Sequence, residues 1–216
     1  MDKRFLIIMG IIVVAFLGIF FLGNSNNESQ NTQNTGTVSN HTTGNNAKNV
    51  ELLVYGDFEC PACGQFAAIE KQVIDKYKDD IAFTFRHFPI DTIHPNARAA
   101  ARAAEAAGAQ GKFFEMHDLL YQTQSQWSSQ VTTNPQPIFE NFAKEIGLDI
   151  NKYTIDYASD TTNSTINADK QECNNKGVNG TPTYFINGVK IDNGQITSVE
   201  GFSKVIEDAI SGANQN

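Results

Sequence analysis

The stretch Asp57-Phe58-Glu59-Cys60-Pro61-Ala62-Cys63-Gly64-Gln65-Phe66 decides the fold of this chain. An apolar run that is typical of a buried strand, Leu52 to Tyr55, precedes it. Apolar residues spaced for one face of a helix follow it: Phe66, Ile69, Val73 and Tyr77. Because proline is favoured at the first helical position, we expect the helix to begin at Pro61 with Cys60 at its N-cap.

The place of Cys60 at a helix start predicts a reactive thiol. Free backbone N–H groups and the positive end of the helix dipole favour a thiolate over a thiol at this position. We therefore expect Cys60 to have a lowered pKa and to act as a nucleophile. Cys63 lies one helical turn further on, where it can close a disulfide with Cys60 and carry two electrons reversibly.

The same cysteine pair could instead form a static disulfide or half of a zinc site. A closed zinc site needs four ligands, usually from two such pairs. The chain offers only Cys173 and four scattered histidines, at positions 41, 87, 94 and 117, and none of these makes a second pair with metal spacing. The strand–CxxC–helix context favours a redox-active pair, and we predict no metal site.

Length, composition and charge bound the class of protein. The 216 residues, 40% of them hydrophobic, are enough for one domain of ordinary size with an appendage. The net charge of -8 argues against nucleic acid as a partner. Three cysteines are too few for the disulfide framework of a small secreted protein.

The N-terminal region predicts a membrane anchor. Lys3 and Arg4 precede an uncharged apolar run from Phe5 to Leu22, which as a helix would rise about 27 Å and cross a bilayer. The run is long for a signal peptide and no small-x-small cleavage site follows it, so we favour an uncleaved anchor over residues 5–23 to a cleaved signal. The basic residues place residues 1–4 in the cytoplasm and everything after the anchor outside, so we expect a single-pass protein of the cell membrane with an extracytoplasmic C-terminal domain.

The remainder divides into a linker, a folded domain and a tail. Residues 24–49 are rich in Asn, Ser, Thr, Gln and Gly without apolar periodicity, and we predict a flexible linker there. The folded domain is expected over residues 50–212 and a tail over 213–216. Its first part, strands at 50–55 and 81–88 around a helix at 61–78, predicts a parallel βαβ unit.

The second half of the domain predicts an α/β fold with a helical insertion. Helical patterns fill residues 92–177, apart from a polar loop at 122–137. The sheet resumes at 183–186, Asn187-Gly188 is a strong hairpin signal, and a return strand at 189–191 and a last helix at 198–210 follow.

These features together resemble a known family. A CxxC at a strand-to-helix turn, with Gly180-Thr181-Pro182-Thr183 before a hairpin and a terminal helix, resembles the thioredoxin fold. The helical insertion, with Phe-Arg-His-Phe-Pro at 85–89 and Ile-His-Pro-Asn-Ala at 93–97, is similar to the DsbA-like branch, which comprises extracytoplasmic thiol–disulfide oxidoreductases. The resemblance covers about Val50 to Ile210.

The resemblance implies roles for individual residues. Cys60 would be the exposed attacking sulfur and Cys63 the buried resolving one, with Pro61 and Ala62 between them. Pro182 would be cis and lie beside the pair, and the Thr181 backbone would pair with a substrate chain like an added strand and tune the redox pair. No cofactor is needed, because the disulfide carries the electrons. The implied partners are reduced or unfolded exported proteins and a quinone-linked membrane protein that reoxidises the pair.

Two features depart from the family pattern: Ala62 between the cysteines and Glu59 beside Cys60. Pro61-Ala62 stands where strongly oxidising members often carry Pro-His, so the thiolate lacks one charge partner and the potential would be less oxidising. We still expect an oxidase, with a reductase or isomerase on the same fold as the alternative. A non-catalytic module that holds unfolded chains at the sheet edge near Pro182 is an alternative from another class. A charged Glu59 near the sulfur would raise the thiol pKa, but we expect it to face solvent, with proton transfer as its alternative role. We expect Cys173 to pack as a small hydrophobe rather than to serve as a free thiol.

Overall fold

The part of the chain that can be placed runs from residue 36 to residue 213. The computed structural model describes this range, and the predicted anchor over residues 5–23 lies outside it. Within residues 36–213, no helix combines the length and the apolar character that crossing a membrane requires.

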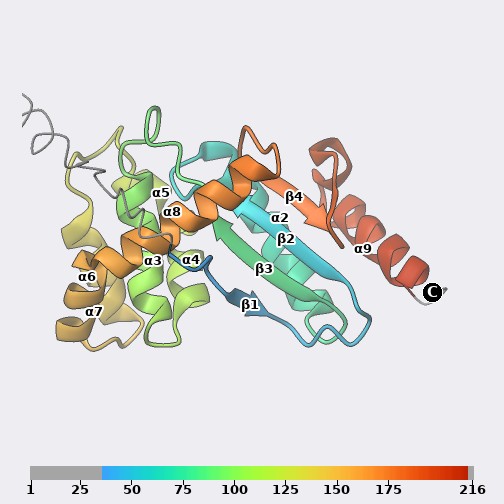
Figure 1. The fold of residues 1–216 in the computed structure, drawn as a ribbon, viewed down its shortest axis with the longest axis horizontal. Coiled ribbons are helices and arrows are strands. Elements are labelled where there is room, and N and C mark those ends of the chain that lie inside the picture. The colour runs from blue at the N-terminus through green and yellow to red at the C-terminus, as the bar shows by residue number, and fades with distance from the viewer. Residues whose placement is uncertain (1–35, 214–216) are drawn as a thin grey trace, which may run out of the picture. The chain divides into compact units, whose positions relative to one another are not determined.

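A five-stranded mixed sheet forms the centre of the domain (Figure 1). Its spatial order is β1-β3-β2-β4-β5. Strands β2 and β3 are parallel, in a register that pairs Glu51 with Ala82 and Gly56 with His87, and every other neighbour is antiparallel. The predicted parallel βαβ unit is confirmed. The strand bounds are β1 His41–Thr43, β2 Glu51–Gly56, β3 Ala82–His87, β4 Thr183–Ile186 and β5 Val189–Lys190.

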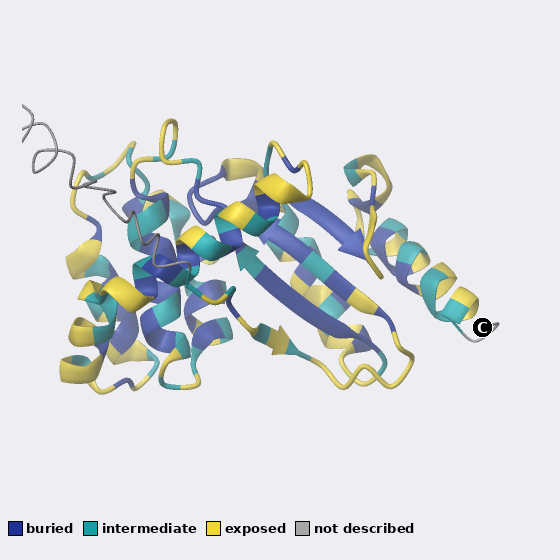
Figure 2. Ribbon diagram, in the orientation of Figure 1, coloured by how far each residue is buried: buried dark blue, intermediate teal, exposed yellow. Residues whose placement is uncertain are grey.

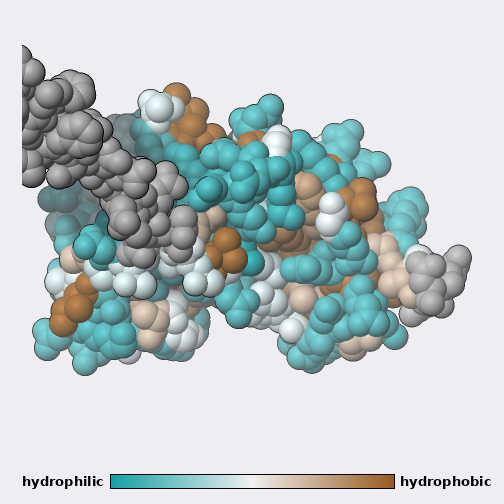
Figure 3. All heavy atoms as spheres, in the orientation of Figure 1, coloured by the Kyte–Doolittle hydropathy of each residue, from teal (hydrophilic) through white to brown (hydrophobic). Residues whose placement is uncertain are grey.

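Helices cover both faces of the sheet because its central strand is apolar on both sides. Leu52 and Val54 of β2 pack in the main core with α2 (Pro61–Tyr77) and α9 (Val199–Ala213). Leu53 and Tyr55 point to the opposite face, in a smaller cluster with Cys173 of α8 (Asp160–Asn175). Figure 1 shows α8 crossing in front of the sheet with α2 behind it, and Figure 3 shows that the outer surface over α8 is hydrophilic.

The predicted helical insertion is confirmed between β3 and β4. Its central helix is α3, whose alanines are buried and let neighbouring helices approach closely (Figure 2). The expected polar loop at 122–137 is wrong in part, because a short helix lies inside it and carries Trp127, fully buried with its indole N–H donated to the Leu120 carbonyl at 3.0 Å. The helices are α3 Ala97–Gly108, α4 Phe113–Gln122, α5 Gln124–Trp127, α6 Gln136–Glu145, α7 Ile150–Ala158 and α8.

The predicted linker is wrong in its second half. Residues 41–43 form β1, which pairs antiparallel with β3. Ser39 is buried just before it, and the Ser39 N–H and hydroxyl both donate to Asp169 of α8, at 2.7 and 2.6 Å. This segment is held by backbone and polar hydrogen bonds rather than by apolar side chains, so hydrophobic periodicity does not reveal it.

The predicted hairpin after β4 is confirmed. Asn187 and Gly188 have φ angles of 47° and 79°, which suit the primed turns that join two strands through two residues. The Asn187 side chain accepts a hydrogen bond from the Glu51 N–H at 2.8 Å and so ties the hairpin to β2. A 3-10 turn, Asn193–Ile196, leads into α9.

Candidate active site

The first turn of α2 presents Cys60 as predicted. Cys60 is the N-cap, with extended backbone angles, and Pro61 occupies the first helical position. The Cys60 N–H donates to the Asp57 carbonyl at 3.1 Å, which closes the turn between β2 and α2. Pro61 and Ala62 are exposed, whereas only 8% of Cys60 and 3% of Cys63 are accessible to solvent. The expectation of a buried Cys63 is confirmed, but that of an exposed Cys60 is wrong, because Thr181 lies against its sulfur.

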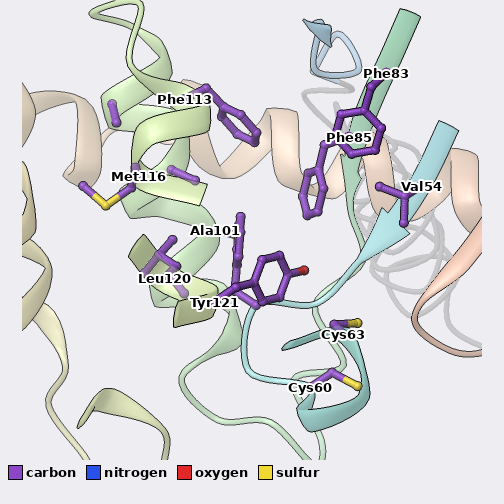
Figure 4. Packing of buried hydrophobic residues seen from close by; sticks show 14 of the residues in the cluster. Val54, Cys60, Cys63, Phe83, Phe85, Ala101, Phe113, Met116, Leu120 and Tyr121 are labelled. Carbon is purple, nitrogen blue, oxygen red and sulfur yellow. The ribbon is translucent and has the colours of Figure 1, made fainter. Parts of the chain in front are cut away.

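The two thiols of this turn have opposite electrostatics. Both are free thiols and project from the first turn of α2, close to Tyr121 (Figure 4). The hydrogen bond from the Cys63 side chain, helped by backbone N–H groups of the turn, outweighs burial and lowers the pKa of Cys60 from 9.0 to about 5. Burial raises the pKa of Cys63 well above its ordinary value. The predicted low pKa of Cys60 therefore has a physical basis in the helix start.

The loop before β4 faces this pair from far along the chain. The Cys60 sulfur lies 3.6 Å from the Thr181 carbonyl oxygen, and the Thr181–Pro182 peptide bond is cis, as the resemblance implies. The Thr181 hydroxyl is buried and has no hydrogen-bond partner in the described part of the chain. Cys60 and Thr181 thus form one site although the whole helical insertion lies between them in the sequence.

Comparison with known proteins agrees with this arrangement. The thioredoxin family matches residues 36–208, a span that includes β1, the cysteine turn and the loop around Pro182. The chain belongs to the thioredoxin family. A Na+/H+ antiporter NhaA 1 of Salinispora arenicola is 33% identical over 172 residues, which make up 80% of this chain and 25% of the antiporter. This chain therefore spans about a quarter of the length of that relative.

Solved structures share the fold of this chain. BdbD of Bacillus subtilis, in its oxidised form, is similar with a TM-score of 0.66 and 22% identity, over 82% of this chain and 97% of BdbD. The α-DsbA1 protein of Wolbachia pipientis is similar with a TM-score of 0.68 and 18% identity, over 80% of this chain and 91% of that one. The predicted thioredoxin fold with an inserted helical block is confirmed.

A buried aspartate organises the loop that leads into the cysteine turn of this thioredoxin-family chain. Asp57 accepts hydrogen bonds from the Glu59 N–H at 2.8 Å, the Ile90 N–H at 2.8 Å and the His94 ring at 2.7 Å. Burial raises the pKa of Asp57, and these hydrogen bonds oppose the rise. His94 therefore has a positioning role at the site that the sequence analysis did not assign to it.

The expectation that Glu59 faces solvent is wrong. Only 5% of Glu59 is exposed, and its carboxylate accepts hydrogen bonds from the backbone N–H groups of Asn96 at 2.6 Å and Ser129 at 2.5 Å. Both donors belong to the helical insertion, whose fold about the active-site turn could not be deduced from local sequence. Glu59 thus fastens the cysteine turn to the insertion.

Gln124 of α5 is a site residue that the sequence analysis missed. Its side-chain amide donates to the carbonyl oxygens of Phe58 at 2.6 Å and Cys60 at 3.0 Å. Gly64 permits this approach, because a Cβ atom there would lie 2.4 Å from the Gln124 side-chain oxygen. A glutamine in a polar stretch carries no signal for such a contact.

A second group of ionisable side chains is buried further along α2. The Tyr184 hydroxyl donates to Glu70 at 2.8 Å, and the ring of His117 lies 4.0 Å from the same carboxylate. Burial raises the pKa of Glu70 from 4.5 to about 8 and lowers the pKa of His117. Glu70 is therefore mostly protonated at neutral pH.

Cys173 is packed in the core, and two of the histidines lie beside a glutamate. Cys173 is fully buried among apolar and aromatic residues, and burial raises its pKa from 9.0 to about 12, which confirms the packing prediction. The sequence predicts no metal site, yet His41, His87 and Glu105 lie close enough together to share one ion.

Proposed function

We propose that this chain is an extracytoplasmic thiol–disulfide oxidoreductase that works as an oxidase through Cys60 and Cys63. The observation that carries the proposal is the low pKa of Cys60, about 5, at a helix N-cap that faces Thr181. The low pKa of the Cys60 thiol stabilises the reduced form of the Cys60–Cys63 pair. The oxidised form, the disulfide, is therefore a stronger oxidant. This favours oxidation of substrates over reduction even though Ala62 supplies no charge to the thiolate.

The reaction is two successive thiol–disulfide exchanges. A substrate thiolate attacks the Cys60 sulfur of the disulfide, forming a mixed disulfide while Cys63 leaves with the bonding electrons and takes up a proton. A second substrate thiolate then attacks the substrate sulfur of the mixed disulfide. Cys60 leaves as a thiolate, the substrate has lost two electrons as a new disulfide, and the Cys60–Cys63 pair has gained them.

The surface around Cys60 suits an extended polypeptide. Pro61 and Ala62 are exposed beside it, and the Thr181 carbonyl stands next to the sulfur, where a substrate backbone can add as a strand. A polar cleft of about 330 Å³ opens beside Pro61, between the cysteine turn and α5, with Ile93 on its rim. In this proposal Pro182 shapes the substrate side of the loop and Glu59 holds the turn in register with the insertion.

The proposal places the domain outside the cytoplasm, next to a membrane. One support is the apolar run over residues 5–23. The other is that two relatives are named Na+/H+ antiporters, and that the region similar to this chain makes up 25% and 22% of their lengths. Reduced exported proteins are the substrates, the protein disulfide is the only electron carrier needed, and a quinone-linked membrane protein reoxidises the pair. These assignments extend the family resemblance to this chain.

Disulfide transfer to an unfolded substrate tests the proposal. Oxidised protein is mixed with a reduced, denatured polypeptide that contains one cysteine pair, and substrate disulfide is measured against time. We expect one disulfide transferred per oxidised chain, none above background with Cys60→Ser, and an unchanged rate with the matched control Cys173→Ala. No transfer by the unaltered protein rejects the activity, and the non-catalytic binding module would then account for binding without transfer.

The direction of the reaction is tested separately by equilibrium with glutathione. An oxidase has a reduction potential nearer that of DsbA, about −120 mV, than that of thioredoxin, about −270 mV. A value near the thioredoxin end would retain the exchange chemistry and replace the oxidase with a reductase.

A further inference from the structure

Three side chains from different parts of the chain converge away from the cysteines. His41 lies on β1, His87 ends β3 and Glu105 lies in the last turn of α3. The Nε2 atoms of His41 and His87 each lie 2.7 Å from the same Glu105 oxygen, Oε1. Two imidazoles and one carboxylate thus present three nitrogen and oxygen ligand atoms to one point.

Packing fixes the ring of His41 over this point. The ring stacks on Phe113 with centroids 3.5 Å apart and planes 8° apart. Gly108 provides the room, since a Cβ atom there would lie 2.8 Å from the His41 ring. A ligand ring whose orientation is already fixed loses little freedom when it binds a metal ion.

His87 is also fixed by packing, but in the described part of the chain only one of its two ring nitrogens has a hydrogen-bond partner. It is 1% exposed and is surrounded by the rings of Phe58, Phe85 and Phe113. Its Nε2 atom faces Glu105, while its Nδ1 atom has no hydrogen-bond partner in the described part of the chain. Moving the ring proton to Nδ1 would free Nε2 for a metal ion without breaking another hydrogen bond.

We propose that His41, His87 and Glu105 form a binding site for one divalent transition-metal ion of the zinc type. Imidazole nitrogen and carboxylate oxygen are the ligands that such ions prefer, and two histidines with one glutamate leave a fourth position for water or an exogenous ligand. The His41 and Glu105 side chains are 16% and 12% exposed, so the ion can enter from the surface.

Ion binding requires a small outward shift of the ligands. Bonds of about 2.0–2.1 Å at tetrahedral angles separate neighbouring ligand atoms by roughly 3.3 Å, more than the present 2.7 Å between Nε2 and Oε1. The partly exposed Glu105 side chain can make this shift, because both short distances end on its Oε1 atom. The bound ion would join β1 to β3 and α3.

Zinc titration of the oxidised protein tests the site without interference from the Cys60–Cys63 thiols. Oxidised full-length protein is titrated with zinc alone by calorimetry, and its thermal unfolding is recorded with and without the ion. We expect one ion per chain and a higher unfolding midpoint with zinc, because the ion binds the folded state. We also expect weaker binding at lower pH, because metal ligands must be deprotonated.

Matched variants separate this site from adventitious binding. His41→Phe keeps a ring stacked on Phe113 and removes one ligand, and Glu105→Gln keeps a hydrogen-bond acceptor of similar shape. Each should weaken zinc binding at least tenfold, whereas His94→Ala should leave it within twofold, although His94 also pairs with a carboxylate. The proposal is overturned if the unaltered protein shows no saturable binding of zinc. It is also overturned if His41→Phe and Glu105→Gln bind zinc as tightly as the unaltered protein does. Disulfide transfer is measured in parallel, and its presence or absence has no bearing on this outcome.

Discussion

Two cysteines of this chain, Cys60 and Cys173, are both buried, yet their chemistry is opposite. Cys60 caps α2, and hydrogen bonds from Cys63 and from the backbone of the first turn hold its pKa at about 5. Cys173 lies in the interior of α8 among apolar and aromatic side chains, and burial raises its pKa to about 12. Burial alone therefore does not determine thiol reactivity; the donors that surround the sulfur do.

The largest expected difference is in the rate of alkylation. At pH 7 Cys60 should be almost entirely thiolate, while about one part in 10⁵ of Cys173 should be. Reduced native protein treated with iodoacetamide should label rapidly at Cys60, with a rate that falls to half near pH 5. Cys173 should label only after denaturation, as mass spectrometry of the separated peptides would show.

The predicted difference between Cys60 and Cys173 would be contradicted if Cys173 were labelled rapidly in the native protein. It would also be contradicted if Cys60 titrated near pH 9, as an ordinary thiol does. Either would mean that the surrounding donors do not control the thiols as described. Urea-denatured protein is the control, since all three cysteines should then react at similar rates.

A buried carboxyl group on α2, the helix that Cys60 caps, gives a second test of how burial and hydrogen-bond donors together set a pKa. Glu70 is as buried as the cysteines, but it receives one hydrogen bond, from Tyr184, and its pKa is raised to about 8. Between pH 4.5 and 8 the folded state holds a proton that the unfolded state has lost, so Glu70 makes stability fall as pH rises through this window. The shift corresponds to a loss on the order of 4 kcal/mol.

Glu70→Gln should remove this pH-dependent loss. The free energy of unfolding of oxidised protein, measured in urea at pH 5 and at pH 8, should fall less between the two values in the variant than in the unaltered protein. The exposed Glu200→Gln should keep the original difference. An unchanged difference in Glu70→Gln would show that this carboxyl is ionised at neutral pH in spite of its burial.

The fold was largely accessible from the sequence because its signals are local. The apolar run before Cys60, the proline after it, the alanine-rich helix and Asn187-Gly188 each specify one element through periodicity, capping or turn geometry. The strand β1 was missed because its residues are polar and it depends on pairing with β3 and on the contact between Ser39 and Asp169. Such pairing is a property of the folded chain and leaves no local pattern.

In the candidate site, too, some residues could be predicted from the sequence and others could not. The N-cap position of Cys60 and the loop at Thr181 and Pro182 could be predicted from the motif and the family resemblance. Asp57, Glu59 and Gln124 could not, because their roles consist of hydrogen bonds across the boundary between the sheet and the helical insertion. Polar contacts between distant segments are the part of this site that sequence patterns do not encode.

Serine substitution at the two positions should give unequal stability losses. In reduced protein at pH 4, where Cys60 is protonated because this pH lies below its pKa of about 5, Cys60→Ser should change the free energy of unfolding by less than about 0.5 kcal/mol, since serine is a favoured N-cap. Cys173→Ser places a hydroxyl in an apolar cluster and should cost about 1–3 kcal/mol. Urea unfolding measures both, and equal losses would mean that the two sites do not differ in polarity.

The smallest expected effect tests how the helical insertion supports the Cys60 side of the comparison. Gln124→Ala removes the two hydrogen bonds to the carbonyls of Phe58 and Cys60, and should cost about 1 kcal/mol of stability. Since the cap would then be less fixed, the midpoint of Cys60 alkylation should rise above pH 5, while Cys173 stays unreactive. Gln126→Ala, an exposed glutamine in the same short helix, is the matched control and should change neither quantity. If the stability falls and the midpoint does not move, Gln124 stabilises the insertion without tuning the thiol, and the donors of α2 alone account for the difference between the two cysteines.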